Sequence, residues 1–202
     1  MSNTNWELSD KFGGHWIKVK FYKEKPDLKE AKQIKDARFC EAVQQALISP
    51  ILLDRKSISC LGAQYAFGWN DNPDLKDKLI EDCLQKRQIS TVNINNIIEK
   101  TFCLKEPFDY IGLNTEGKPD LVISYLQPGE VMRIIKLYNN NGQNLNISCA
   151  TMMAICGDVA VKSFLTGDIS FSFGCDDSRE YGKIGRDRMA VGIPSNLFNL
   201  FV

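Results

Sequence analysis

The sequence has one histidine, no net charge and no pair of cysteines in a CxxC arrangement, and each absence removes a class of function. Lysine plus arginine and aspartate plus glutamate both total 25, so the overall charge gives no attraction to nucleic acid or to an anionic membrane. A single histidine excludes a His-rich metal site, and the position of His15 near the N-terminus disfavours a papain-like Cys–His pair. The glycine-rich nucleotide fingerprints and the HExxH motif are missing as well. We therefore expect no nucleic-acid partner.

Long hydrophobic runs and a secretory signal are also absent. The first residues lack the basic region followed by an apolar run that a signal peptide has. The longest nearly apolar stretches, such as 150–160, fall far short of the about 18–20 residues that cross a bilayer. These features predict a cytoplasmic protein with no membrane partner, and thiols stay reduced in the cytoplasm. The seven cysteines are therefore interpreted as free thiols or ligands, and not as a disulfide framework.

Hydrophobic periodicity predicts strands that alternate with helices along most of the chain. The predicted strands are 16–22, 51–53, 57–60, 120–126, 169–173 and 189–193. The predicted helices are 28–48, 61–67, 74–86, 93–102, 128–138 and 148–164, the last with Ser148 as a candidate N-cap. This alternation predicts an α/β or α+β fold, a mixed sheet covered by helices, in a single domain of residues 1–202.

An internal similarity in the sequence suggests that the domain contains two similar half-units, 16–103 and 108–202. In the first, a predicted helix with Cys40 is followed by a short strand and then by a turn that begins with Cys60. In the second, a predicted helix with Cys156 is followed by a short strand and then by a turn that begins with Cys175. Either an ancient duplication or chance explains the match.

The segments around these cysteines resemble the domain of unknown function 169 family, which is found in archaea and anaerobic bacteria. The matching runs are CEAVQQA from Cys40, SCLGAQYAFG around Cys60, CATMMAICGD from Cys149, FGCDDSRE around Cys175 and VGIP at 191–194. The resemblance extends from about Trp16 to the C-terminus. The CPGA or CAGA form common at such turns is matched by the run from Cys60, whereas the run CDDS from Cys175 departs from it. Because the family is uncharacterised, the resemblance implies little chemistry, although its anaerobic hosts imply an oxygen-sensitive centre.

The cysteines are candidate ligands of an iron–sulfur cluster or of another metal. Their spacing does not fit a zinc knuckle, and Cys149 and Cys156 would lie about 10 Å apart along one predicted helix. Iron–sulfur clusters accept thiolates from distant parts of a chain. The opposing interpretation is that the cysteines are core residues, because free cysteine packs as a small hydrophobe. Cys83 and Cys103 lie outside the family-like motifs and are expected to be structural. The candidate ligands are Cys40, Cys60, Cys149, Cys156 and Cys175.

Two further functions remain open from the sequence. A small-molecule-binding module without catalysis would use Arg179 and Ser178 of the second turn and Tyr65 of the first, since the arginine fork suits carboxylate and phosphate. Helix capping alone accounts for Ser178 and the acidic residues before it, but not for Arg179. A thiol enzyme would use Cys60 or Cys175, where a turn and a helix start lower the pKa of a thiol. The three hypotheses are thus a metal-binding redox or sensor protein, a small-molecule-binding module and a thiol enzyme.

Overall fold

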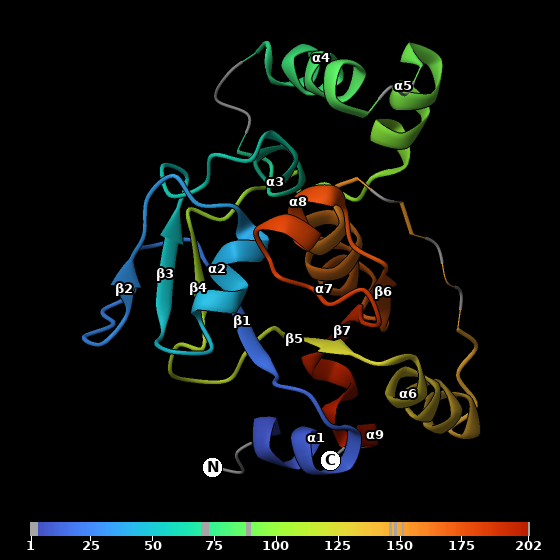
Figure 1. Cartoon of the computed structure of the whole chain (residues 1–202). Coiled ribbons are helices and arrows are strands. Elements are labelled where there is room, and N and C mark those ends of the chain that lie inside the picture. The colour runs from blue at the N-terminus through green and yellow to red at the C-terminus, as the bar shows by residue number, and fades with distance from the viewer. Residues whose placement is uncertain are drawn as a thin grey trace.

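A mixed seven-stranded sheet in the order β2-β3-β4-β1-β5-β7-β6 forms the centre of the protein (Figure 1). The computed structural model describes residues 4–69, 73–87, 90–145, 147, 149–150 and 152–201. The strands are β1 (Ile17–Tyr22), β2 (Lys32–Gln33), β3 (Ile51–Asp54), β4 (Tyr110–Leu113), β5 (Leu121–Leu126), β6 (Ser170–Ser172) and β7 (Met189–Pro194). Neighbouring strands pair antiparallel, except that β2 runs parallel to β3. The predicted α/β class is confirmed.

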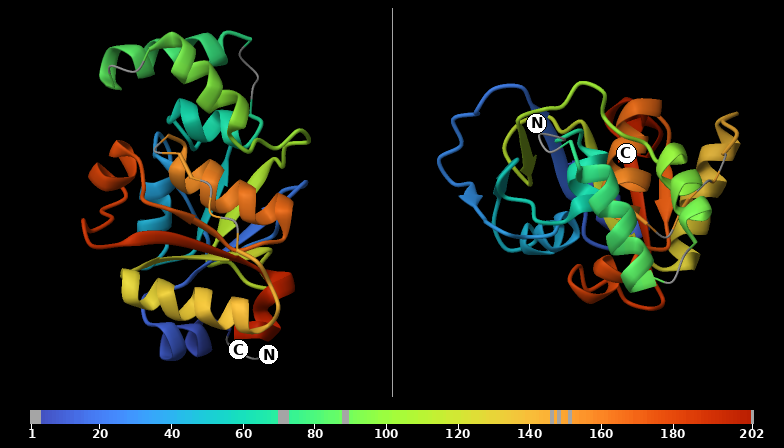
Figure 2. Two further views of the ribbon diagram at one scale, coloured as in Figure 1. Left: turned by 90° about the vertical axis from the view of Figure 1, so that its right-hand side faces the viewer. Right: turned by 90° about the horizontal axis from the view of Figure 1, so that it is seen from above.

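Helices cover both faces of this sheet (Figures 1 and 2). One face carries α1 (Thr4–Phe12), α6 (Pro128–Asn140) and α9 (Phe198–Phe201), the last preceded by the 3-10 turn η2 (Ser195–Leu197). The other carries α2 (Phe39–Gln45), α3 (Leu61–Ala66), the π-helix η1 (Ala154–Val161), α7 (Lys162–Thr166) and α8 (Asp176–Glu180). The helices α4 (Leu75–Arg87) and α5 (Thr91–Lys100) lie beyond α3, farthest from the sheet. Within the described residues, no helix combines the length and the apolar character that crossing a bilayer requires.

Alternate residues of the central strand β5 enter two separate cores. Leu121 and Ile123 belong to the core beneath α2, α3 and η1, whereas Val122 and Leu126 belong to the core beneath α1 and α6. Successive side chains of a strand point to opposite faces, so a strand buried on both sides is apolar at nearly every position. This double burial explains the continuous run DLVISYL that marks β5 in the sequence.

The sheet divides into two similar halves between β1 and β5. In the first half β3 pairs with β4 and β4 pairs with β1, and in the second β6 pairs with β7 and β7 pairs with β5. The chain runs α2–β3–α3 in the first half and η1–α7–β6–α8 in the second. The order of helices and strands therefore repeats along with the positions of the cysteines. Because β4 (Tyr110–Leu113) pairs with β1, it belongs to the first half.

The helix predicted over 28–48 is wrong in its first part, because α2 begins only at Phe39. Lys32 and Gln33 instead form the edge strand β2 against β3, and Ala37 bridges Ile58. These main-chain bonds to neighbouring segments replace helical ones, a tertiary effect that local periodicity does not record. The strand predicted over 57–60 is reduced to that single bridge at Ile58.

The helix predicted over 148–164 also begins later, at Ala154, and its first part is a π-helix. The proposed cap Ser148 lies outside the described residues. Met153, immediately before the helix, has a left-handed φ of 53°, and the Oδ2 atom of Asp158 accepts a 2.7 Å hydrogen bond from the main chain of Ala150. The buried Asp158 carboxylate thus holds the preceding segment outside the helix. The predicted strands 16–22, 51–53, 120–126, 169–173 and 189–193 are confirmed, with ends that differ by at most one residue.

The close approach of η1 to β7 predicts that Gly192 is needed for stability. A Cβ at position 192 would lie 2.9 Å from the main-chain oxygen of Val159 and 2.9 Å from the Oγ atom of Ser170. Gly192→Ala is expected to lower the free energy of unfolding by about 1–3 kcal/mol, because the backbone must shift to admit the methyl group. Urea denaturation measures the change. The matched control is Gly129→Ala in the first turn of α6, where no atom lies within 4 Å, and we expect it to be neutral or to stabilise. Equal stability of the two variants would contradict this account of the packing.

Candidate functional site

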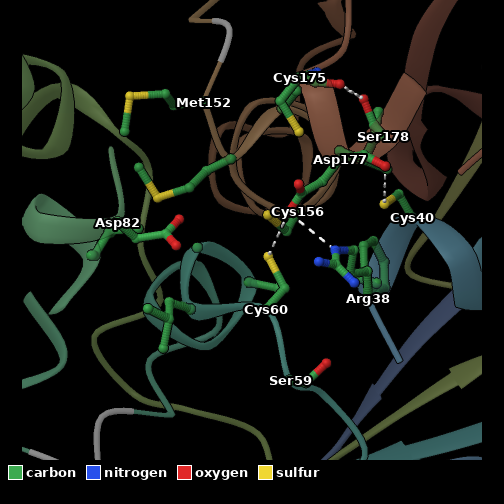
Figure 3. A pocket seen from close by; sticks show the side chains of 18 of the residues that line it. Arg38, Cys40, Ser59, Cys60, Asp82, Met152, Cys156, Cys175, Asp177 and Ser178 are labelled. Carbon is green, nitrogen blue, oxygen red and sulfur yellow. Dashed lines mark hydrogen bonds and ion pairs between the residues drawn. The ribbon is translucent and has the colours of Figure 1, made fainter. Parts of the chain in front are cut away.

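Four of the seven cysteines lie at the starts of four helices on one face of the sheet. Cys40 is the second residue of α2 and Cys156 the third of η1, while Cys60 and Cys175 immediately precede α3 and α8. All four line a single cavity of about 110 Å³, and their sulfur atoms converge in Figure 3. One water molecule needs only about 10–15 Å³ of such space, so the cavity holds a group of several atoms.

The repeated half-sheets position these four thiols. Each half supplies one cysteine from the helix that precedes β3 or β6 and one from the turn that follows that strand. Gly182 lets the chain after α8 pack directly on α2, because a Cβ there would lie 2.9 Å from the Cβ of Cys40. The thiol group is therefore formed between the two halves, from residues far apart in the sequence.

Burial and mutual repulsion keep the thiols of Cys40, Cys60 and Cys156 protonated. Burial raises the pKa of the Cys60 thiol to about 11, and the neighbouring Asp177 and Cys175 shift it in the same direction. Burial also raises the pKa of Cys40 and of Cys156, and repulsion from the other thiols of the group adds to both shifts. The sequence-based expectation that a helix start lowers the pKa of Cys60 is wrong, because desolvation outweighs the local donors. This argues against Cys60 as an activated nucleophile.

Main-chain N–H groups nevertheless point toward the sulfur atoms. Those of Gly62 and Ala63 oppose the rise in the pKa of Cys60, and that of Gly157 opposes the rise at Cys156. The N–H group of Glu41 acts in the same way on the pKa of Cys40. The site therefore presents fixed donors to any sulfur that becomes negatively charged, a feature typical of thiolate ligands.

An ion pair joins two of the segments that bear the thiols. The Nε atom of Arg38, just before α2, lies 3.2 Å from the Oδ2 atom of Asp177 in α8. The same Oδ2 atom lies 3.9 Å from the Sγ atom of Cys60, and the guanidinium group stacks 3.6 Å from the ring centre of Tyr181. Cys40 donates a 3.7 Å bond to the main-chain oxygen of Asp177. Sequence reasoning missed Arg38, although a cation is an unusual residue at the N-cap of a helix and was a signal in itself.

Tyr125 of β5 is a second residue that sequence reasoning missed. Its hydroxyl oxygen is buried and has no hydrogen-bond partner among the described residues. Burial raises its pKa well above the ordinary value, and Cys40 and Cys175 contribute to the shift, so the hydroxyl lies beside the thiol group. A polar atom left without a partner in a buried place is rare in proteins. A tyrosine within the apolar run of β5 was the available sequence signal.

Of the remaining three cysteines, two lie outside the cavity and one lines it from the interior of a helix. Cys149, which the sequence grouped with the ligands, is exposed and is not among the residues that line the cavity. Cys83 does line the cavity, with its Sγ atom 4.0 Å from the Sδ atom of Met152, but it lies in the interior of α4. Cys103 donates a 3.0 Å bond to the main-chain oxygen of Tyr65 outside the cavity.

The residues predicted to bind a small molecule are placed differently from one another. Ser178 lines the cavity, but its hydroxyl accepts a 2.7 Å bond from the N–H group of Cys175 and donates a 2.7 Å bond to the main-chain oxygen of that residue. Tyr65 is half-buried on α3 and does not line the cavity. Arg179 does not line it either. Its guanidinium group donates to the main-chain oxygens of Phe173, Ile184 and Gly185, which fixes the loop after α8.

The described residues do not include three His, Cys, Asp or Glu side chains close enough together to hold one metal ion. The four thiols line the cavity and do not lie close enough together to bind a single ion.

Comparison with known proteins places this arrangement in a family. The model of the DUF169 family, described as "Uncharacterised ArCR, COG2043", matches residues 14–202, which contain all seven cysteines. The resemblance seen in the sequence is confirmed. The comparison with curated proteins and the comparison with solved structures gave no match.

Differences in burial predict the order in which the thiols react in metal-free protein. Cys149 is exposed whereas Cys40 and Cys156 are buried, so iodoacetamide near neutral pH is expected to modify Cys149 first. Its rate should exceed those at Cys40, Cys60 and Cys156 by about tenfold or more, because a raised pKa lowers the thiolate fraction. Mass spectrometry of peptides taken over time measures each rate. Faster modification of Cys60 than of Cys149 would instead favour a reactive turn thiol.

Proposed function

Since the chain belongs to the uncharacterised DUF169 family, we propose its function from the site itself: the protein binds an iron–sulfur cluster through Cys40, Cys60, Cys156 and Cys175 and serves in redox chemistry or sensing. The observation on which the proposal rests is that four thiols from four segments line one cavity. Four cysteine thiolates are the ligand set of both [2Fe–2S] and [4Fe–4S] clusters.

The size of the site favours a cluster over a single ion. A zinc ion needs its thiolates about 2.3 Å away on all sides, which requires the four sulfur atoms to meet closely. No such group of ligands occurs among the described residues, although four thiols face the cavity of about 110 Å³. The ligands of an iron–sulfur cluster are separated by the width of the cluster. Four thiols that line one cavity without lying close together therefore support a cluster.

The electrostatics of the site support the same conclusion. Thiolates must replace thiols when a metal binds, and the raised pKa values of Cys40, Cys60 and Cys156 make that change unfavourable without a positive group among them. The N–H groups of Gly62, Ala63 and Gly157 lie near the sulfur atoms and would stabilise their ionised form, and those of Ala63 and Gly157 also donate to the main-chain oxygens of Cys60 and Met153. Hydrogen bonds of this kind and the degree of burial set the reduction potential of such centres.

Cys83 and Cys149 are left out of the proposed ligand set for different reasons. Cys149 is exposed and lies away from the cavity. Cys83 lies in the interior of α4, where main-chain N–H groups bond within the helix and none is left for a thiolate. These two residues therefore provide controls that retain the rest of the site.

Metal and sulfide analysis of protein produced without oxygen tests the proposal. We expect brown protein with iron and acid-labile sulfide in equal amounts, and with visible absorption that fades on reduction. Changing Cys40, Cys60, Cys156 or Cys175 to Ser is expected to lower the iron content by about tenfold, because each change removes one ligand.

Cys149→Ser and Cys83→Ser should keep the iron content of the parent protein. Circular dichroism confirms that each variant is folded. Colourless parent protein without iron from an oxygen-free preparation would overturn the proposal, as would loss of iron from Cys149→Ser to the same extent as from Cys60→Ser.

Removal of the cluster should also destabilise the protein. A ligand that binds only the folded state raises the melting temperature, and four ligands from both halves of the sheet make the site part of the fold. Oxidative removal followed by chelation and gel filtration is expected to lower the Tm by about 5–10 °C. Scanning calorimetry measures the shift. The Cys175→Ser variant serves as the control, since the same treatment should leave its Tm unchanged.

A further inference from the structure

A second cavity adjoins the thiol site along α2 and β5. Its volume is about 350 Å³, within the range of about 300–1,000 Å³ typical of small-molecule sites. Its apolar floor is formed by Ile17 and Ile123, which face each other across β1 and β5, together with Val43 of α2. Because Val43 follows Cys40 by three residues, successive turns of α2 face the two cavities.

The polar lining of the second cavity is positive. Lys183 and Arg188 come from the loop after α8, and His15 comes from the turn before β1. The residues that line it include neither Asp nor Glu. The Nη1 atom of Arg188 donates a 3.0 Å bond to the main-chain oxygen of Tyr125, which holds the guanidinium group against the wall.

Lys183 has features of a residue held for binding. It is exposed, and among the described residues its ammonium group has no hydrogen bond or ion pair. Its φ of 51° is left-handed, which costs a lysine conformational energy and persists only where the surroundings enforce it. The bonds of Arg179 to the main-chain oxygens of Ile184 and Gly185 supply that enforcement, since they fix the loop immediately after Lys183.

Two nearby buried hydroxyl groups point away from this lining. The side chain of Ser124 lies on the face of β5 that carries Val122 and Leu126, where a Cβ on Gly14 would lie 2.6 Å from its Oγ atom. The hydroxyl of Tyr125 lies beside Cys40 and Cys175. The two cations of the lining therefore supply the donors suited to the oxygens of an anion.

We propose that this second cavity binds a small molecule bearing a carboxylate or phosphate group, held by Lys183 and Arg188 next to the thiol site. The ligand chemistry is that of an oxyanion on a partly apolar body, because cations line one part of the cavity and aliphatic side chains line the other. The assignment does not depend on a metal in the thiol site. Tyr125 lies between the two, with its ring in the wall of the second cavity and its hydroxyl beside Cys40 and Cys175.

Calorimetric titration with inorganic phosphate and with succinate, at constant ionic strength set by sodium chloride, tests the proposal. We expect saturable binding of at least one of the two probes, and the probe that binds identifies the source of the oxyanion. Lys183→Gln and Arg188→Gln are each expected to weaken that binding by about tenfold, because each removes a charge-assisted bond. The matched control is Lys29→Gln, which changes an exposed lysine far from Lys183 in the sequence. This variant should bind the probe as the parent protein does.

The outcomes separate this proposal from that of the cluster. Retained binding in Cys60→Ser supports an oxyanion site that is independent of the cluster. Lys183→Gln keeps the test valid even where Arg188→Gln loosens β5 through the lost bond to Tyr125. No saturable binding of either probe to the parent protein would overturn the proposal, and so would an equal loss in Lys29→Gln and Lys183→Gln.

Discussion

The antiparallel pairing of β1 with β5 joins the two half-sheets, and the rest of the structure depends on it. Ile17 faces Ile123 and Val19 faces Leu121 in this ladder, which fixes the register of one half against the other. The helices above the sheet follow that register, so Cys40 and Cys60 from one half meet Cys156 and Cys175 from the other. A register shift of one residue would turn every side chain of β5 to the opposite face of the sheet and would disrupt the packing of both cores.

The thiol site balances two opposed demands. Burial among Met152, Met153 and aliphatic side chains excludes water, which stabilises the core and protects a sensitive group. The same burial penalises charge on the thiols. Fixed N–H donors at the helix starts offset part of that penalty, whereas the carboxylate of Asp177, which pairs with Arg38, adds to it. A site with both properties is suited to a ligand that brings its own positive charge.

The sequence predicted the fold class, most strands and the repeated order of elements, because these depend on local periodicity and on burial of alternate residues. It also selected Cys40, Cys60, Cys156 and Cys175, which lie in matching turns and helices, but it added Cys149, which lies outside the cavity. It failed where distant contacts decide the local structure. β2 forms only because β3 offers it a partner, and the helix start at Ala154 depends on the bond between Asp158 and Ala150. Arg38, Tyr125 and the second cavity required the tertiary arrangement, because their partners lie on other elements of the fold.

Tyr125 lines the second cavity, and its hydroxyl lies beside two of the thiols, which has a thermodynamic consequence. Its main-chain oxygen is held by Arg188, and the two thiols are those of Cys40 and Cys175. A ligand of the second cavity that moves the tyrosine ring therefore also moves the hydroxyl beside those thiols. Linkage then requires reciprocity: an occupant of the thiol site that alters the affinity of the second cavity by some factor has its own affinity altered by the same factor. Tyr125 is the side chain through which the two proposed ligands would be coupled.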